Sequence, residues 1–172
     1  MLIDFDRKKA REILLKFSSL LRFQLYECNG VVAISKELEF LENYIELEKI
    51  RKKNLVVAYN VPAHLPSFEI MPFLLQPLVE NAFKHVSSYA DANNFIEINI
   101  QADEMKLHVE IKNSYDETTS GDEHTGGIGL RNIEMRLLLL YPGRHEFKIE
   151  KDKKIFTANL IVHAGKNKLH HR

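Results

Sequence analysis

The sequence predicts an α+β fold: a two-layer α/β sandwich with a mostly antiparallel mixed sheet, helices on one face, and additional N-terminal helices. Three observations predict it. Two long amphipathic helices open the chain, two later pairs of segments alternate apolar and polar residues, and helical segments separate those pairs. Because strands joined by short turns pair antiparallel, we expect hairpins to dominate the sheet and helices to cover one of its faces.

Apolar residues at helical spacing predict a first helix over 6–27, which Asn29-Gly30 ends, and a second over 35–53, which Ser35 caps. Their long apolar faces favour packing on a core or pairing with a second copy of the chain. Residues 55–61 then form a predicted strand. Pro72 is expected to open a third helix that runs to His85, since a missing N–H costs nothing in a first turn.

The second half of the chain supplies the two hairpins. Residues 95–101 and 105–113 alternate and form the first, and residues 145–150 and 155–162 form the second. Between them, 114–125 show no apolar period and are predicted to form a loop, and 128–141 form a helix that Pro142-Gly143 ends. The polar residues 165–172 are expected to form a flexible tail.

Composition limits the classes of function. The 172 residues suit one domain, and a formal net charge of zero with a pI near 7.1 does not suggest a surface for nucleic acid. The single Cys28 excludes an internal disulfide. No apolar run approaches the roughly 18 residues of a membrane-spanning helix.

The segment QPLVENAFKHV, residues 76–86, places polar residues on one stripe of a helix. Gln76, Glu80 and Lys84 are spaced by four, as are Asn81 and His85. An ordinary solvated stripe would show the same spacing. An asparagine carbonyl, however, is an oxygen ligand that suits Mg²⁺ alongside phosphate oxygens and water. Glu80 could accept a proton or orient a nucleophile, and Lys84 or His85 could meet phosphate charge.

The segment GGIGLRNIEMRL, residues 126–137, is a glycine-rich turn that opens a helix. Glycines let the backbone approach a ligand closely, and the free N–H groups of a helix start attract phosphate. A plain loop-to-helix turn explains the same residues without a ligand.

The two motifs together resemble those of a known family. PLVENAFKH resembles the N-box, and GGIGLRNIEMRL the G-box, of the histidine-kinase ATP-binding domain, whose superfamily includes gyrase, heat-shock chaperone ATPases and mismatch-repair ATPases. LLRFQLYE, ISKELEFLENYIELEKIRKKN and RNIEMRLLLLYPGRHEFKI are similar to segments of the LytS-type sensor kinases. The resemblance covers about residues 10–162.

This resemblance implies four parts. Residues 1–30 would be a remnant helix of the dimerisation and phosphoacceptor region, 31–54 a linker helix, 55–164 the ATP-binding catalytic domain, and 165–172 a tail. It implies ATP and Mg²⁺ as cofactors, and transfer of the γ-phosphoryl group to a histidine for relay to a response regulator.

The resemblance also implies partners and a location. A homodimer and a response regulator, of the LytTR type for many relatives, would be the partners, with no direct contact to nucleic acid. The chain would be a cytoplasmic part of a protein anchored in the bacterial cytoplasmic membrane.

Roles are carried over by matching motif positions. Asn81 would ligate Mg²⁺, and residues 114–125 would form the ATP lid. The residues implied as catalytic are Glu80 and Lys84, and those implied to bind nucleotide are Asn81, His85, Asn113, Gly127, Gly129, Leu130, Arg131 and Asn132.

Two positions depart from the family pattern. Asn113 stands where relatives carry the aspartate of a DxGxG box that accepts from the adenine amino group, so nucleotide affinity is expected to be weak. None of the eight histidines lies in an NPHFLFN-like segment, so we expect this chain not to phosphorylate itself efficiently. A regulatory module with little nucleotide affinity is the first alternative, and an ATPase of the chaperone or gyrase kind the second.

Overall fold

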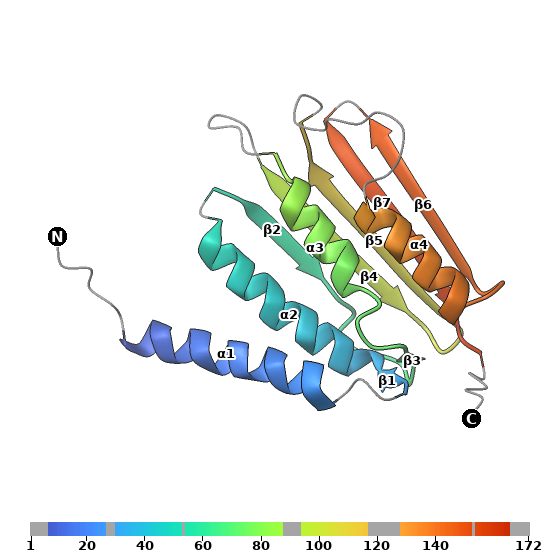
Figure 1. The fold of residues 1–172 in the computed structure, drawn as a ribbon, viewed down its shortest axis with the longest axis horizontal. Helices are drawn as coiled ribbons and strands as arrows, with labels where there is room; N and C mark the ends of the chain where they lie inside the picture. Colours follow the sequence, from blue (N-terminus) through green and yellow to red (C-terminus); the bar gives the residue numbers. More distant parts are fainter. Residues whose placement is uncertain are drawn as a thin grey trace.

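The computed structural model describes residues 7–26, 30–52, 54–87, 94–116, 128–152 and 154–165. The helices are α1 Arg7–Tyr26, α2 Ile34–Arg51, α3 Gln76–His85 and α4 Ile128–Leu140. The strands are β1 Val32–Ala33, β2 Val56–Asn60, β3 Glu69–Ile70, β4 Phe95–Ala102, β5 Lys106–Ser114, β6 His145–Asp152 and β7 Ile155–His163 (Figure 1).

The main sheet has five strands in the order β2-β4-β5-β7-β6. Strands β4 and β5 form one antiparallel hairpin and β6 and β7 the other, and β5 pairs antiparallel with β7 between them. Only β2 runs parallel to its neighbour, with Val56 opposite Phe95. The prediction of a mostly antiparallel mixed sheet is therefore confirmed.

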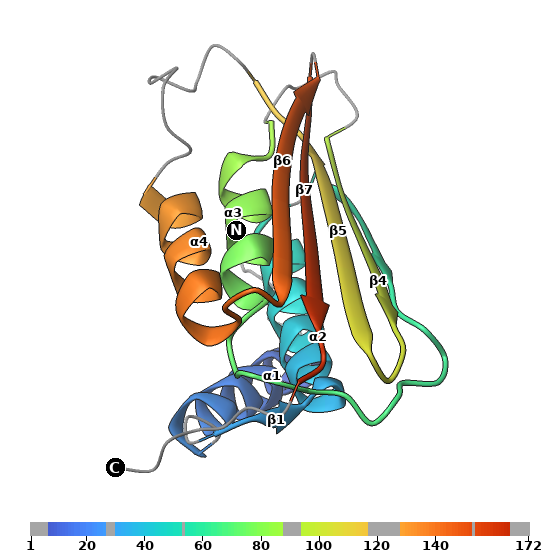
Figure 2. The same ribbon diagram turned by 90° about the vertical axis from the view of Figure 1, so that its right-hand side faces the viewer.

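One face of this sheet lies under α2, α3 and α4, so that helices and strands form two layers (Figure 2). Alternate residues of each central strand point to that face because side chains along a strand alternate. They are buried with the helices in one core: Ile96, Ile98 and Ile100 of β4, Leu107, Val109 and Ile111 of β5, and Phe156, Ala158, Leu160 and Val162 of β7.

Helix α1 lies outside the two layers and packs against α2 (Figure 1). Its Phe23 ring contacts Phe40 of α2, with ring centroids 4.8 Å apart, and Phe73, at 5.1 Å. Leu20 is the one buried residue of α1. Several large apolar residues of α1 are exposed: Leu14, Leu15, Phe17, Leu21, Leu25 and Tyr26.

The third helix starts later than predicted. Pro72 and Phe73 precede it, and Phe73 takes a φ of 58°, in the left-handed region that a helix cannot continue through. The helix begins at Gln76, so the predicted start at Pro72 is wrong, and Pro77 takes the first-turn position instead.

Two smaller expectations also differ from the structure. Ser35 does not cap α2: the helix starts at Ile34 after Ala33, and no side chain caps it. Strands β1 and β3 were not anticipated, since each has two residues and too few positions to show a period. They pair antiparallel, with Val32 opposite Ile70, and β1 directly precedes α2. Within the described ranges, no helix combines the length and apolar character needed to cross a membrane.

Candidate functional site

Helix α3 carries the first motif on a short, firmly packed segment. Leu75 is its N-cap residue, and Pro77 follows in the first turn. One side of the helix is buried by Leu78, Val79, Ala82 and Phe83. This apolar side packs next to α4 and β5 and so fixes the direction in which the polar residues point.

The polar residues of α3 occupy two rows. Gln76, Glu80 and Lys84 form the outer row, where the Gln76 amide donates to the Glu80 carboxylate at 2.5 Å, and both Glu80 and Lys84 are exposed. Asn81 lies at the boundary with the buried side and is half-buried. Its side chain makes no hydrogen bond to any described residue, so its carbonyl oxygen is available to a ligand.

His85 closes the motif in an electropositive setting. Burial lowers the pKa of its imidazole below the ordinary 6.5, and the positive charges of Lys84 and Lys151 lower it further. Lys151, on β6, was not anticipated, because only the fold brings this strand close enough to α3 for its charge to act on His85.

Asn113 is the most unusual polar residue of the core. It lies on β5 between Ile96 and Phe156 and is fully buried, on the face covered by the helices. Its Nδ2 donates to the Ser114 carbonyl at 3.0 Å, but its Oδ1 has no hydrogen-bond partner among the described residues. A buried acceptor without a partner costs roughly 1–3 kcal/mol, which makes it a candidate ligand contact.

A buried polar cluster joins the end of α3 to the end of β5. The Ser87 N–H donates to the Ser114 carbonyl at 2.9 Å. The Ser87 hydroxyl lies 2.7 Å from Asn94 Oδ1 and 2.8 Å from the Ser114 hydroxyl. The Phe95 N–H completes the cluster by donating to the Ser114 hydroxyl at 3.1 Å. Ser87, Asn94 and Ser114 were missed in the sequence, where short polar residues next to loops are common.

Helix α4 contains the described part of the glycine-rich motif. Gly129 and Leu130 lie inside the first turn of α4 rather than in a turn ahead of it. Leu130 is buried and anchors that turn, whereas Arg131 and Asn132 are exposed. A Cβ added at Gly129 would meet no atom within 4 Å, so there is open space beside the backbone at this point. Gly127 lies outside the described residues, as does most of the predicted lid, from 117 to 125.

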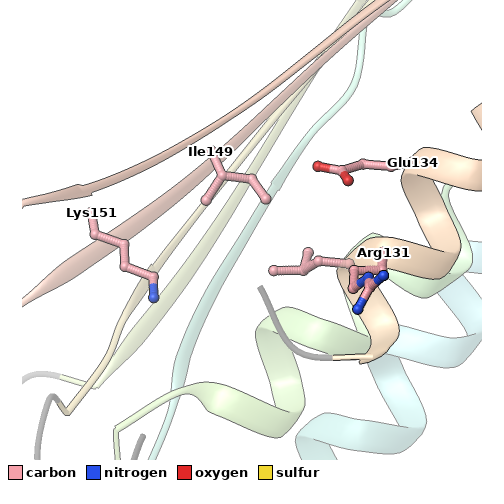
Figure 3. A pocket seen from close by; sticks show the side chains of 5 residues that line it. Arg131, Glu134, Ile149 and Lys151 are labelled. Carbon is pink, nitrogen blue, oxygen red and sulfur yellow. The ribbon is translucent and has the colours of Figure 1, made fainter. Parts of the chain in front are cut away.

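A small groove of about 190 Å³ separates the start of α4 from β6. Leu130, Arg131 and Glu134 line it from the helix, and Ile149 and Lys151 from the strand (Figure 3). It is smaller than the roughly 300 Å³ at which ligand pockets usually begin, so it would hold only part of a larger molecule.

The fold brings three of the predicted elements together. The last turn of α3, the first turn of α4 and the end of β5 lie at the same end of the two layers, although the chain separates them widely (Figures 1 and 2). Asn113 near the end of β5, His85 at the end of α3, and Arg131 and Asn132 near the start of α4 therefore share one end of the molecule. Glu80 and Asn81 lie about one turn before His85 in α3.

Known proteins similar to this chain are sensor kinases. A family model described as "Histidine kinase" matches residues 1–56. Sensor protein LytS of Enterococcus faecalis is 30% identical over 158 residues, which are 84% of this chain and 27% of that protein. Sensor protein LytS of Staphylococcus haemolyticus is 31% identical over 153 residues, 81% of this chain and 26% of that protein. The chain is a relative of the LytS-type sensor histidine kinases.

Solved structures of histidine kinases have the same fold. The catalytic domain of histidine kinase ThkA superposes with a TM-score of 0.53 at 16% identity, covering 78% of this chain and 94% of that domain. Histidine kinase AdeS of Acinetobacter baumannii gives a TM-score of 0.54 at 14% identity, covering 88% of this chain and 75% of that one. The chain itself spans about a quarter of the length of the LytS proteins, 26–27% for the two above.

Proposed function

We propose that this chain is the ATP-binding catalytic part of a two-component sensor histidine kinase. It would hold Mg-ATP at the end of the molecule where α3, α4 and β5 meet, and present the γ-phosphoryl group to a histidine for relay to a response regulator. Relatives that are sensor kinases and a fold shared with kinase catalytic domains support the proposal.

The observation that carries this proposal is the unpaired Oδ1 of Asn113. A bound adenine would donate its exocyclic amino group to this oxygen and remove the cost of a buried, unpaired acceptor. The Nδ2 of Asn113 already donates to the Ser114 carbonyl, so the side chain offers a ligand only its acceptor. A single neutral hydrogen bond agrees with the expectation of weak nucleotide affinity.

The residues of α3 fit the phosphate end of the ligand. Asn81 would give one oxygen to Mg²⁺, and phosphate oxygens and water would complete the octahedral coordination. The described residues contain no group of three or more His, Cys, Asp or Glu able to hold a metal, so Mg²⁺ would bind with the nucleotide rather than before it. Phosphoryl transfer depends mainly on positioning and charge neutralisation, for which Glu80, Lys84 and His85 are suitably placed.

The residues of the α4 motif would complete the nucleotide site. Arg131 and Asn132 are exposed at the start of α4, where the helix N-terminus favours negative charge. Together with Gly127, Gly129 and Leu130, they are the residues that we propose lie along the nucleotide.

Calorimetric titration tests the proposal directly. ATP is titrated with and without Mg²⁺ into the wild-type chain, Asn81→Ala and the control Asn43→Ala, which removes an equally half-buried helix asparagine from α2. We expect Mg-dependent binding that Asn81→Ala abolishes and Asn43→Ala leaves unchanged. A folded wild-type chain without measurable binding would contradict the proposal and favour the alternative, a regulatory module that does not use nucleotide.

A second experiment tests the kinase activity. A separate fragment bearing a phosphoacceptor histidine is mixed with this chain and labelled ATP. Acid-labile phosphate should appear on the fragment and disappear with Asn81→Ala. Good nucleotide binding without transfer to the histidine would contradict kinase activity, and release of free phosphate instead would favour an ATPase.

The partners proposed from the relatives are a second copy of the chain and a response regulator, with LytTR-type regulators the first to test. An apolar stripe on α1 supports the dimer: Leu14, Phe17, Leu21 and Leu25 lie on one side of the helix with 43–74% of each side chain exposed. We also propose that the longer protein is anchored in the bacterial cytoplasmic membrane and that this part lies in the cytoplasm.

A further inference from the structure

Glu37 is a charged residue that the proposed chemistry does not use, yet it is completely buried. It lies in the first turn of α2, and its carboxylate reaches into the segment ahead of α3. Oε2 accepts from the Phe73 N–H at 2.9 Å, and Oε1 accepts from the Leu75 N–H at 3.0 Å. One side chain of α2 thus binds two N–H groups of the segment from which α3 begins.

The same segment is also held by α4 and by Tyr141, the residue that follows this helix. The Arg136 guanidinium donates to the Pro72 carbonyl at 2.6 Å, and the Tyr141 hydroxyl accepts from the Met71 N–H at 2.8 Å. Residues 71–75, which we call the α3 entry segment, therefore lie between α2 and α4 and bond to both. Helix α3 packs more extensively against α4 and β5 than directly against α2.

The entry segment is also fixed in an uncommon backbone conformation. Phe73 has a φ of 58°, which costs a non-glycine residue energy and persists only where the surroundings impose it. Two contacts impose it here. Glu37 binds the N–H groups on either side of the turn, and the Phe73 ring packs edge-on against Phe40 of α2, with centroids 5.5 Å apart.

We propose that Glu37 is a positioning residue that couples helix α2 to the nucleotide site, by holding the entry segment whose conformation sets where α3 begins and hence where Asn81 lies. The inference rests on the proposed function, because one of its tests measures the affinity for Mg-ATP. A shift of α2 would move the carboxylate, and with it the first turn of α3. Because α4 bonds to the same segment, both helices that carry the nucleotide motifs would respond.

Replacement of one atom tests this coupling. In Glu37→Gln, the side-chain oxygen can accept from only one of the two N–H groups, while the shape of the side chain is kept. Glu39→Gln is the matched control, since it makes the same change of charge at an exposed position of the same helix. Tyr141→Phe is a second variant, which releases the segment from the α4 side by removing the acceptor of the Met71 N–H.

We expect Glu37→Gln to speed amide hydrogen exchange at Phe73 or Leu75, to shift the NMR signal of the Asn81 side-chain amide, and to weaken Mg-ATP binding about five-fold or more, measured well below the melting temperature. Tyr141→Phe should act in the same direction, and Glu39→Gln should change none of the three. If Glu37 served stability alone, the melting temperature would fall and the affinity of the folded chain would stay unchanged, which overturns the proposal.

Coupling between two sites is reciprocal, so the wild-type chain provides a further test. Saturating Mg-ATP should slow exchange of the Phe73 and Leu75 amides, and Glu37→Gln should reduce this effect. If the wild-type chain binds no nucleotide, the proposed function fails, and the Asn81 signal then decides the inference on its own. An Asn81 signal unaltered by both Glu37→Gln and Tyr141→Phe would refute the coupling.

Discussion

The backbone N–H of Ser87 donates to the carbonyl of Ser114 over 2.9 Å, joining the end of α3 to the end of β5. The two residues are 27 positions apart in the chain, and their hydroxyls lie 2.8 Å from each other. This junction sets the position of the polar residues on α3 relative to Asn113, the residue before Ser114.

Ser87→Ala should lower the free energy of unfolding by about 1–2 kcal/mol, because it removes the buried hydrogen bonds that join the Ser87 hydroxyl to Asn94 Oδ1 and to the Ser114 hydroxyl. Urea denaturation measures the change. Ser35→Ala, an exposed position in α2, serves as the control and should change stability little. An equal effect of the two substitutions would contradict a structural role for the cluster.

Asn113→Asp should tighten Mg-ATP binding about five-fold, because a charged acceptor makes a stronger hydrogen bond to the adenine amino group. The same substitution should destabilise the unliganded chain, since it buries a charge beside no described partner. Calorimetry and thermal unfolding measure the two effects. Asn159→Asp, on the other face of the adjoining strand β7, should change affinity little. A loss of affinity with Asn113→Asp would place adenine elsewhere.

The pKa of Glu37 predicts a pH dependence of stability. Burial raises this pKa above its ordinary 4.5, against the lowering effects of the Leu75 and Phe73 N–H groups and of Arg136. The phenols of Tyr59 and Tyr141 also face the carboxylate, and both have raised pKa values. Between the unfolded and the folded pKa, Glu37 thus keeps a proton in the folded chain that it releases in the unfolded chain. The stabilisation that this proton gives is complete below the unfolded pKa and is lost as pH rises through the folded pKa.

Glu37→Gln should remove that dependence. We expect the free energy of unfolding of the wild type, relative to the variant, to fall as pH rises from about 4.5 toward neutral. Urea denaturation across this range measures the difference, with Glu39→Gln as the control that should keep the wild-type slope. Parallel curves for the wild type and Glu37→Gln would show that the carboxyl group does not titrate in this window.

The pKa of His85 should change when the charges around the imidazole change. Its pKa is lowered by burial and by the positive charges of Lys84 and Lys151, so Lys151→Met should raise it. A bound nucleotide should raise it as well, because phosphate favours the imidazolium. NMR titration of the His85 ring measures both shifts. Lys148→Met, on the opposite face of β6, is the control and should leave the pKa of His85 nearly unchanged.

The exposed stripe on α1 predicts self-association. Leu21→Lys should shift the chain toward the monomer, since a charge in the centre of an apolar contact is costly to bury. Sedimentation across a range of concentrations measures the effect. Leu139→Lys adds the same charge at an exposed leucine of α4 and should leave association unchanged. If both variants associate as the wild type does, the stripe is not the dimer surface.

Much of the fold could be predicted from local patterns. Buried residues alternate along most of β4, β5 and β7 because one face is buried, and short turns leave little choice of partner within each hairpin. The start of α3 could not be predicted, because Pro72 and Pro77 both suit a first turn. The segment between the two prolines bonds to Glu37, which lies far back in the chain and appears in the sequence as an ordinary polar residue of an amphipathic helix.

The sequence by itself predicted the four helices, the five strands of the main sheet, the pairing of four of those strands into two hairpins, and the two motifs that carry the resemblance to histidine kinases. Those features depend on residues close together in the chain, where spacing alone shows which side chains share a face. Only the tertiary structure decided that Asn113 has an unpaired buried oxygen, that Lys151 acts on His85, and that Glu37 holds the entry to α3. Burial and electrostatic interaction between distant residues depend on the packing of whole elements, which local spacing does not contain.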